Sequence, residues 1–415
     1  MAQKFPLGFW NYNRGNFFTG PEEVERWHRL GMTMVTCPEF NPAHDDPAKL
    51  NAILDEVQKY GMTALLQIDG TFYGGGDEEE FEKKIADICE KYAKHPAVVG
   101  FYIGEEPDYN SLPKFGVTAR IIKKVRPDLI PYMNLGSTDR CDVSMLHAER
   151  TVQRWLIDFE KETGIGVMGF GNYEIQELTP AGTEKFFKNL YDFVNASEAA
   201  GTDLWATLLS SSHYWFRTPT LADYFRQLSV CAASGCRGAI WFRLYDKFLA
   251  GDYRGSPFNE YGEETETFRY MSEAQRHFND QYGELFMRLK HQNTYHITHA
   301  YGGYYLLTEG FQPCPLISKV VSPAAPYGTQ SVQPIDGVMG LFDGGDGWTY
   351  AAFVNNTHDQ PGCFEITLSE KATVAEDVLR NGEMTTASDF RLQPDGSRMN
   401  QLWVAPGRMS VIRIK

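Results

Sequence analysis

The chain has 415 residues, of which 42% are hydrophobic and 14% aromatic, and its formal net charge at pH 7 is −15. This length exceeds a typical single domain and suits two, with enough apolar residues for a large core. An acidic chain repels phosphate backbones and anionic lipids, so we expect neither nucleic acid nor a membrane surface as its partner.

No stretch of the sequence is long and apolar enough to be typical of a transmembrane span. The first residues, MAQKFPLGFW, lack the pattern of a secretory signal peptide. The location is left open: cytoplasmic as the sequence stands, or periplasmic or secreted if a signal peptide has been removed. The seven cysteines are scattered, with no CxxC pair and no metal-ligand spacing, so we expect no disulfide framework, no zinc site and no cofactor.

Short apolar runs alternate with amphipathic segments from about residue 5 to about residue 250. The runs recur at intervals of roughly 30 residues, the length of one β-α unit. Most are nearly continuous apolar stretches, as expected for parallel strands that are covered on both faces. The eight runs are FPLGFWNYN, MTMVTCPEF, MTALLQIDG, AVVGFYIGEEP, IPYMNLG, GIGVMGFGNYEI, DLWATLLSSSHYWF and CRGAIWFRLYD.

The segments between these runs carry the start and stop signals of helices. Asp46 is placed to cap a helix that Gly61 ends. The run Asp77–Glu80 predicts the acidic first turn of another helix, where negative charge suits the helix dipole. Thr179 and Thr218, each followed by a proline, open two more.

Eight strands with helices between them predict either a closed barrel or a doubly wound sheet. The glycine run at 74–76 lacks the GxGxxG spacing of a dinucleotide fold, and eight units favour a (β/α)8 TIM barrel, which we assign to residues 1–290. Beyond it, short alternating runs separated by Gly, Asp, Asn and Pro predict an all-β sandwich over residues 291–415. We expect the sandwich to pack on the barrel or to add a binding surface.

In such a barrel the active site lies at the C-terminal ends of the strands. Carboxylates, amides, a histidine and aromatic residues gather at these positions, and aromatic rings stack on the apolar C–H faces of sugars. We therefore expect a carbohydrate substrate, with His213 bonding it or tuning a carboxylate and Arg243 pairing with a carboxylate. The expected substrate-binding residues are Glu105, Tyr12, Asn172, Tyr173, His213, Trp215, Arg243 and Asp246.

The sharpest feature is the run His95–Asp108, in which an apolar strand ends in Glu105, Glu106 and a proline. Two acids at the end of a buried strand are costly unless function or ion pairing keeps them. Crowding of two carboxylates raises the pKa of one of them, which suits a general acid. A salt-bridged strand end is the alternative interpretation of the same residues.

These residues resemble a clan of (β/α)8 glycoside hydrolases. HPAVVGFYIGEEPD is similar to the strand-four signature HPA..GWYLADEP, and FGNYEI resembles the strand-six segment YDYYP, with Asn172 at the Asp position. RTPTLADYFRQLSVCAASGCRGAIWFRLYD resembles the clan's helix seven and strand eight, and GVMGLFDGGDGWTYAAFVNN its C-terminal sandwich. The resemblance extends along most of the chain and implies that Glu106 is the general acid/base and Glu105 its neighbour.

The chain departs from the clan at strand seven. The clan's nucleophile is a Glu at the end of this strand, whereas WATLLSSSHYWF contains no carboxylate. Another acid can take its place, with Glu174 as first choice and Asp246, Glu39 and Asp69 behind it. The enzyme can instead be inverting, with a base about 6.5–9.5 Å from the acid. The third interpretation is a sugar-binding barrel that has lost hydrolysis.

We therefore expect a glycoside hydrolase in which Glu106 protonates the leaving oxygen and Glu174 attacks the anomeric carbon or activates water. The alternative is a non-catalytic carbohydrate-binding barrel. A metal-dependent amidohydrolase is disfavoured, because no HxH pair follows the first predicted strand. The sequence leaves open the sugar, the linkage, retention or inversion, exo or endo action, and the oligomeric state.

Overall fold

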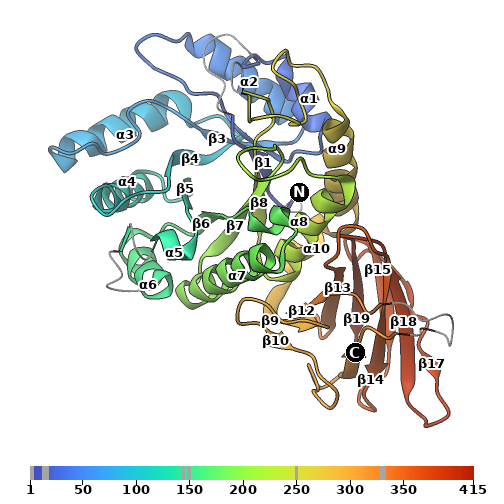
Figure 1. Ribbon diagram of the computed structural model, residues 1–415. Coiled ribbons are helices and arrows are strands. Elements are labelled where there is room, and N and C mark those ends of the chain that lie inside the picture. Colours follow the sequence, from blue (N-terminus) through green and yellow to red (C-terminus); the bar gives the residue numbers. More distant parts are fainter. Residues whose placement is uncertain are drawn as a thin grey trace.

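The computed structural model describes residues 4–11, 18–141, 145–146, 151–247, 251–324, 326 and 333–415. Parallel strands at the centre are surrounded by helices, and antiparallel strands follow at the C-terminal end of the chain (Figure 1). The predicted TIM barrel followed by a β-sandwich is confirmed.

The eight barrel strands lie in the order β1-β8-β7-β6-β5-β4-β3-β2, with parallel pairings. Thr33 closes the remaining gap between β1 and β2: its backbone N donates to the Leu7 carbonyl at 3.0 Å and its Oγ1 accepts from the Leu7 N at 2.8 Å. The strands are β1 (Leu7–Phe9), β2 (Met34–Thr36), β3 (Thr63–Leu66), β4 (Val98–Glu105), β5 (Ile130–Leu135), β6 (Val167–Gly171), β7 (Asp203–Leu209) and β8 (Gly238–Phe242).

The helices lie around the outside of these strands (Figure 1). The short 3-10 helix η2 (Glu174–Glu177) follows β6, and η3 (Asn279–Gly283) and α10 (Glu284–Arg288) lead out of the barrel. The remaining helices are α1 (Glu23–Arg29), α2 (Pro47–Lys59), α3 (Glu78–Tyr92), α4 (Leu112–Val125), α5 (Thr138–Arg140), α6 (Val152–Thr163), α7 (Pro180–Ala200), α8 (Leu221–Ala233) and α9 (Glu266–Phe278).

Three of the four predicted helix starts are found where expected. Asp46, Asp77 and Thr179 each accept a hydrogen bond from a backbone N–H in the first turn of α2, α3 and α7. The helix expected to open at Thr218 begins instead at Leu221. Thr220 and Asp223 form a reciprocal capping box there, which satisfies more backbone donors than the earlier threonine and so sets the start.

The interior of the barrel is filled by side chains. Trp10 lies 4.5 Å from Tyr102 between ring centroids, and Tyr132 stacks on Trp205 at 5.1 Å. Aliphatic side chains of β2, β3, β6 and β8 complete this inner cluster. Because the axis is packed, a ligand has to bind at the open end of the barrel rather than inside it.

The C-terminal sandwich consists of two sheets that enclose their own apolar cluster, with antiparallel pairings except for one parallel pair at an edge of the larger sheet. One sheet has the order β10-β9-β12-β13-β19-β15-β16 and the other β11-β14-β18-β17. The strands are β9 (Lys290–Ile297), β10 (Tyr305–Leu306), β11 (Ile317–Val321), β12 (Gly337–Asp343), β13 (Thr349–Asn355), β14 (Gly362–Leu368), β15 (Ala375–Arg380), β16 (Met384–Ala387), β17 (Arg391–Leu392), β18 (Arg398–Val404) and β19 (Met409–Ile414).

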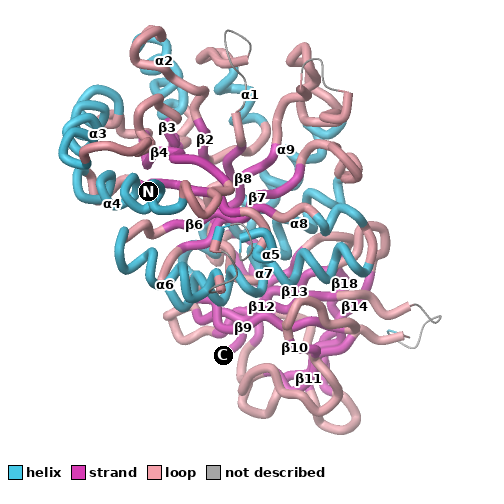
Figure 2. The backbone as a smooth tube through the Cα atoms, turned by 60° about the vertical axis from the view of Figure 1, so that its left-hand side comes forward, coloured by secondary structure: helices cyan, strands magenta, loops and turns pink. Residues whose placement is uncertain are grey.

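The sandwich packs directly on the barrel through α8. β12 and β13 lie next to α8, as can be followed in Figure 2. A Cβ placed on Gly340 would lie 2.0 Å from the Ala233 carbonyl oxygen, and one on Gly407 would lie 2.1 Å from that of Ala222. Only glycine permits this approach. The change from helices to strands falls between α10 and β9, and the division of the chain at residue 290 stays a prediction.

Among the described residues, no helix has the length and apolar character needed to cross a membrane. None of the seven cysteines, all of which lie in the described ranges, forms a disulfide, and six of them are buried. No group of three or more His, Cys, Asp or Glu side chains within the described ranges is arranged to hold a metal ion.

Candidate active site

The end of β4 contains a bulge that turns Glu105 toward the barrel axis. Tyr102 pairs with Tyr132 and Glu105 with Asn134, so β4 uses one residue more than β5 between these pairs. The extra residue is accommodated next to Gly104, whose φ of +135° disfavours any side chain. Side chains alternate along a regular strand, and the bulge therefore places Tyr102 and Glu105 on the same, inward side.

Three carboxylates act on the buried hydroxyl of Tyr102. Burial raises the pKa of this phenol most, and the charges of Glu105, Glu39 and Glu106 raise it further. The pKa of Tyr173 is likewise raised by burial, then by Glu105 and Glu106. These effects place Glu39, Glu105 and Glu106 around one end of the packed barrel axis.

Glu106 lies at the rim of this end and is bound by Arg140 of α5. The guanidinium Nη1 and Nη2 donate to the two carboxylate oxygens at 3.2 and 2.7 Å. This is a bidentate pair of ionised groups, with 40% of the Glu106 side chain still exposed. Glu106 also has a φ of +43°, which is uncommon outside glycine and often marks functional positions.

Glu174 lies in a different environment from the β4 acids. It is the first residue of η2, and its backbone N donates to Asn172 Oδ1 at 3.1 Å. Burial raises the pKa of its carboxyl, while the charge of Lys185 lowers it and those of Glu177 and Asp139 raise it. Lys185 belongs to α7, Glu177 to η2 and Asp139 to α5, next to Arg140, so the charges that act on Glu174 come from these three elements.

Three further acids were considered for the second role, and each is held by a different hydrogen bond. Asp246 accepts a hydrogen bond from the Ser256 N at 2.9 Å and helps to hold the loop after β8. Asp69 accepts from Asn41 Nδ2 at 2.8 Å. Glu39 accepts from Gln67 Nε2 at 3.4 Å and acts on Tyr102, so among these alternatives it is the acid placed with Glu105 and Glu106.

Aromatic rings gather where β6, β7 and β8 end. The ring of His213 lies 5.7 Å from that of Tyr173 and is stacked on Tyr253 at 5.3 Å. Burial lowers the pKa of His213, which favours the neutral imidazole. Trp215 is 69% exposed and donates from Nε1 to Glu177 at 2.9 Å. The structure therefore brings Tyr173 and His213 together, and the exposed Trp215 lies beside them, 5.3 Å from the Phe216 ring that Tyr173 contacts.

Of the remaining predicted residues, Arg243 is buried and donates from Nε to the Tyr245 carbonyl at 2.7 Å, with its guanidinium 5.8 Å from the Tyr253 ring. Asn172 is buried, and its Nδ2 has no hydrogen-bond partner among the described residues. Tyr12 lies outside the described residues.

Sequence reasoning missed two residues of this region, Arg140 and Tyr253. Arg140 comes from the segment after β5, and Tyr253 from the loop after β8. Neither lies at a strand end, so the rule that directed attention to strand ends passed over both. The salt-bridged alternative considered for the strand-four acids was the one signal that pointed to a cation such as Arg140.

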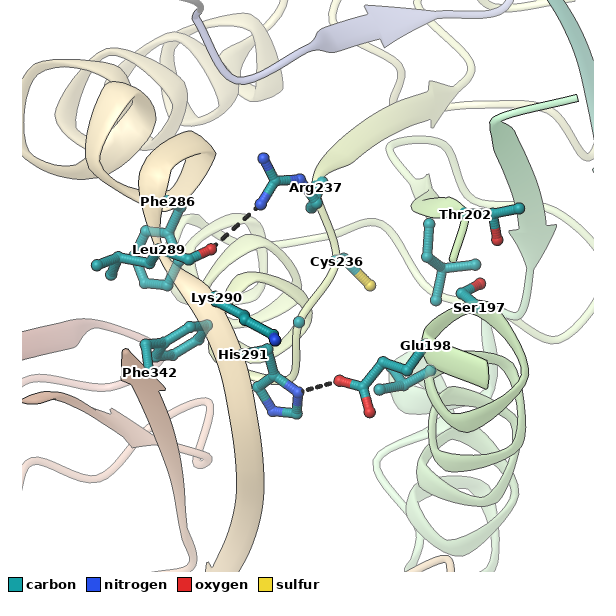
Figure 3. A pocket seen from close by; sticks show the side chains of 13 residues that line it. Ser197, Glu198, Thr202, Cys236, Arg237, Phe286, Leu289, Lys290, His291 and Phe342 are labelled. Carbon is teal, nitrogen blue, oxygen red and sulfur yellow. Dashed lines mark hydrogen bonds and ion pairs between the residues drawn. The ribbon is translucent and has the colours of Figure 1, made fainter. Parts of the chain in front are cut away.

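A separate cavity of about 300 Å³ lies at the opposite end of the barrel, where β7 and β8 begin. Figure 3 shows Arg237 and Cys236 on one side of it, facing Thr202 and Glu198. Arg237 donates to the Met287 and Leu289 carbonyls at 2.6 and 3.2 Å. These contacts join the barrel to the start of the sandwich, so the cavity belongs to the domain boundary and not to the candidate active site.

No family model matches the sequence, and no curated protein matches it either. Solved structures match its fold. The β-galactosidase from Bacillus circulans sp. alkalophilus is 10% identical, with a TM-score of 0.60 over 99% of each chain. A family 39 glycoside hydrolase from the gut symbiont Bacteroides cellulosilyticus WH2 is 12% identical, with a TM-score of 0.50 over 99% of this chain and 81% of that one.

The β-galactosidase from the psychrophilic Marinomonas ef1 matches 66% of this chain at 11% identity, with a TM-score of 0.49, and the chain spans 59% of its length. At these identities a likeness shows the fold alone. The expected resemblance to glycoside hydrolases is confirmed at that level. The strand-four signature and the acid/base role of Glu106 stay predictions.

Proposed function

We propose that the protein hydrolyses glycosidic bonds at the open end of the barrel. The observation that carries this proposal is the placement of Glu105 and Glu106 at the end of β4, with Glu105 turned inward by the bulge, and of Glu39 beyond the end of β2, where Gln67 binds it. Hydrolysis of a glycosidic bond needs two carboxyl groups on either side of it, one to donate a proton and one to attack or to activate water. The fold shared with solved glycoside hydrolases supports the same class of reaction.

Glu106 is the proton donor in this proposal, and Glu39 takes the second role in place of Glu174. Glu39 acts on Tyr102 together with Glu105 and Glu106, whereas Glu174 is not among the charges that act most on Tyr102 or Tyr173. Glu105, turned inward by the bulge, bonds a sugar hydroxyl or orients Glu106. Because Arg140 binds both carboxylate oxygens, Glu106 has to separate from it before it can donate a proton to the leaving oxygen.

A non-catalytic sugar-binding barrel is the second candidate. The Arg140–Glu106 pair is the observation that favours it, because a carboxylate held by two charge-assisted hydrogen bonds is a poor proton donor. In that case the acids and aromatic rings bind the sugar and no bond is broken.

A panel of aryl glycosides and oligosaccharides distinguishes the two candidates. We expect wild type to turn over at least one member and Glu106→Gln to lose about 10²–10⁴-fold in kcat, the usual contribution of a general acid. Glu82→Gln is the matched control, because Glu82 forms an exposed ion pair with Lys124 on the outer helices. Binding of a sugar without turnover in wild type would support the second candidate.

A further inference from the structure

We propose that Arg226 is a positioning residue through which the sandwich holds the segment after β6. That segment carries Asn172, Tyr173 and Glu174. The expected effect on activity rests on the proposed function, whereas the hydrogen-bonded link between the sandwich and this segment does not. It gives the sandwich a part in shaping the site without any contact between the sandwich and the substrate.

Other side chains of α8, the helix that carries Arg226, bind the backbone at the end of β7. Gln227 of α8 accepts from the Leu209 N at 2.8 Å and donates to the Leu209 carbonyl at 3.1 Å. The Tyr224 hydroxyl donates to the Ser210 carbonyl at 3.2 Å. The position of α8 therefore sets where β7 ends and where the loop with His213 begins.

Arg226 hydrogen-bonds both the segment after β6 and the sandwich. Its Nε donates to Asn356 Oδ1 at 2.9 Å, and its Nη1 donates to the Ile175 carbonyl at 3.4 Å. Both Arg226 and Asn356 are 4% exposed, so neither contact competes with bulk water. One rigid guanidinium thus bridges η2 and the end of β13.

The charge of Arg226 is retained in this buried place. Burial lowers its pKa to about 10, and the carboxylates of Asp223 and Asp336 oppose that change. Since this value lies well above neutral pH, the guanidinium stays protonated and keeps all its donors. A buried cation is kept only where its partners are in place, so the contacts to Asn356 and Ile175 are energetically coupled.

The sandwich end of the bridge is itself fixed. The Asn356 N donates to the Asp336 carbonyl at 2.9 Å. The preceding Asn355 donates from Nδ2 to the Gln360 and Val404 carbonyls at 2.8 and 2.9 Å. Together with the close approach of Gly340 and Gly407 to α8, these contacts make the sandwich a rigid support.

The test measures amide hydrogen exchange of residues 172–177 in the full chain, for wild type, Arg226→Met, Arg226→Lys and Asn356→Ala. Arg288→Met is the matched control. Arg288 of α10 also joins the barrel to the sandwich, by donating a hydrogen bond to the Asn381 carbonyl, but it does not belong to α8. Arg226→Lys keeps the charge and guards against a Met variant that fails to fold.

We expect exchange of residues 172–177 to rise roughly tenfold or more in Arg226→Met and Asn356→Ala, and to stay at the wild-type rate in Arg288→Met. A double variant that combines Arg226→Met with Asn356→Ala should show little more than the larger single effect, because both changes break one bridge. Where a glycoside is turned over, kcat/KM should fall roughly tenfold in the same variants. Unchanged exchange in Asn356→Ala and in Arg226→Met (or in Arg226→Lys if the Met variant does not fold), or an equal rise in Arg288→Met, would overturn the proposal. Because exchange needs no turnover, this outcome is separate from a failure of the proposed hydrolysis.

Discussion

Arg140 binds both carboxylate oxygens of Glu106, at 3.2 and 2.7 Å, although the two residues belong to different β-α units. The pair sits at the rim of the barrel, with 62% of the Arg140 side chain exposed and 40% of Glu106. An exposed ion pair contributes little to stability. Its importance therefore lies in where it holds the proposed proton donor.

The first prediction concerns this pair. Arg140→Ala should change the free energy of unfolding by less than about 1 kcal/mol, because exposed ion pairs are screened by water. The same change should alter kcat for any glycoside that wild type turns over, because Glu106 loses the group that holds it. Urea unfolding and steady-state kinetics check the two parts. A loss of several kcal/mol would mean that the pair is structural.

The second prediction separates the two candidates for the second carboxylate. Glu39→Gln should reduce kcat by about 10²-fold or more, whereas Glu174→Gln should leave it within about threefold of wild type. The reason is that Glu39 acts on Tyr102 with the β4 acids, while Glu174 is not among the charges that act most on Tyr102 or Tyr173. The reverse order of the two effects would restore Glu174 to the role that the sequence suggested.

The third prediction tests the bulge in β4. Gly104→Ala should lower the free energy of unfolding by about 2–3 kcal/mol, because φ is +135° and the added Cβ would lie 2.9 Å from the Phe115 ring. It should also reduce activity by turning Glu105. Gly164→Ala is the control: its φ is +61° with nothing within 4 Å, so only the smaller backbone cost of about 1 kcal/mol applies. Equal losses in the two variants would remove the argument for a constrained bulge.

The fourth prediction concerns stability in acid. Burial lowers the pKa of His296 from 6.5 to about 4 in the folded chain. Between these values the unfolded chain binds a proton that the folded chain does not, so stability falls as the pH drops from 6.5 to 4. This histidine should account for up to about 3 kcal/mol of that loss. His296→Gln should flatten the pH dependence of urea unfolding, while His358→Gln, at a half-buried position, should not. A wild-type slope in both variants would contradict the assignment.

The strand runs, most helix caps and the sandwich were predictable from the sequence, because periodicity and capping are local properties. The eight apolar runs overlap β1 to β8, and Asp46 and Asp77 cap α2 and α3 as expected. The start of α8 was misplaced because two threonines compete there and only Thr220 has an acid three residues on.

The geometry of the candidate site was less predictable. Nothing in VVGFYIGEE shows that a bulge at Gly104 reverses the side on which Glu105 lies, because strand alternation alone puts it opposite Tyr102. The partner of Glu106 depends on where the chain returns after β5, which brings Arg140 into contact across 34 residues. The preference for Glu39 over Glu174 as the second carboxylate also depends on contacts between residues far apart in the sequence.

The dependence of the Glu106→Gln effect on the leaving group tests the central claim most directly. A proton donor is needed for a poor leaving group and hardly at all for a good one. With a phenyl glycoside, kcat/KM should fall by about 10²–10⁴-fold, whereas with the matching dinitrophenyl glycoside it should stay within about tenfold of wild type. Equal losses for both substrates, or no loss for either, would contradict the account of Glu106 as the proton donor.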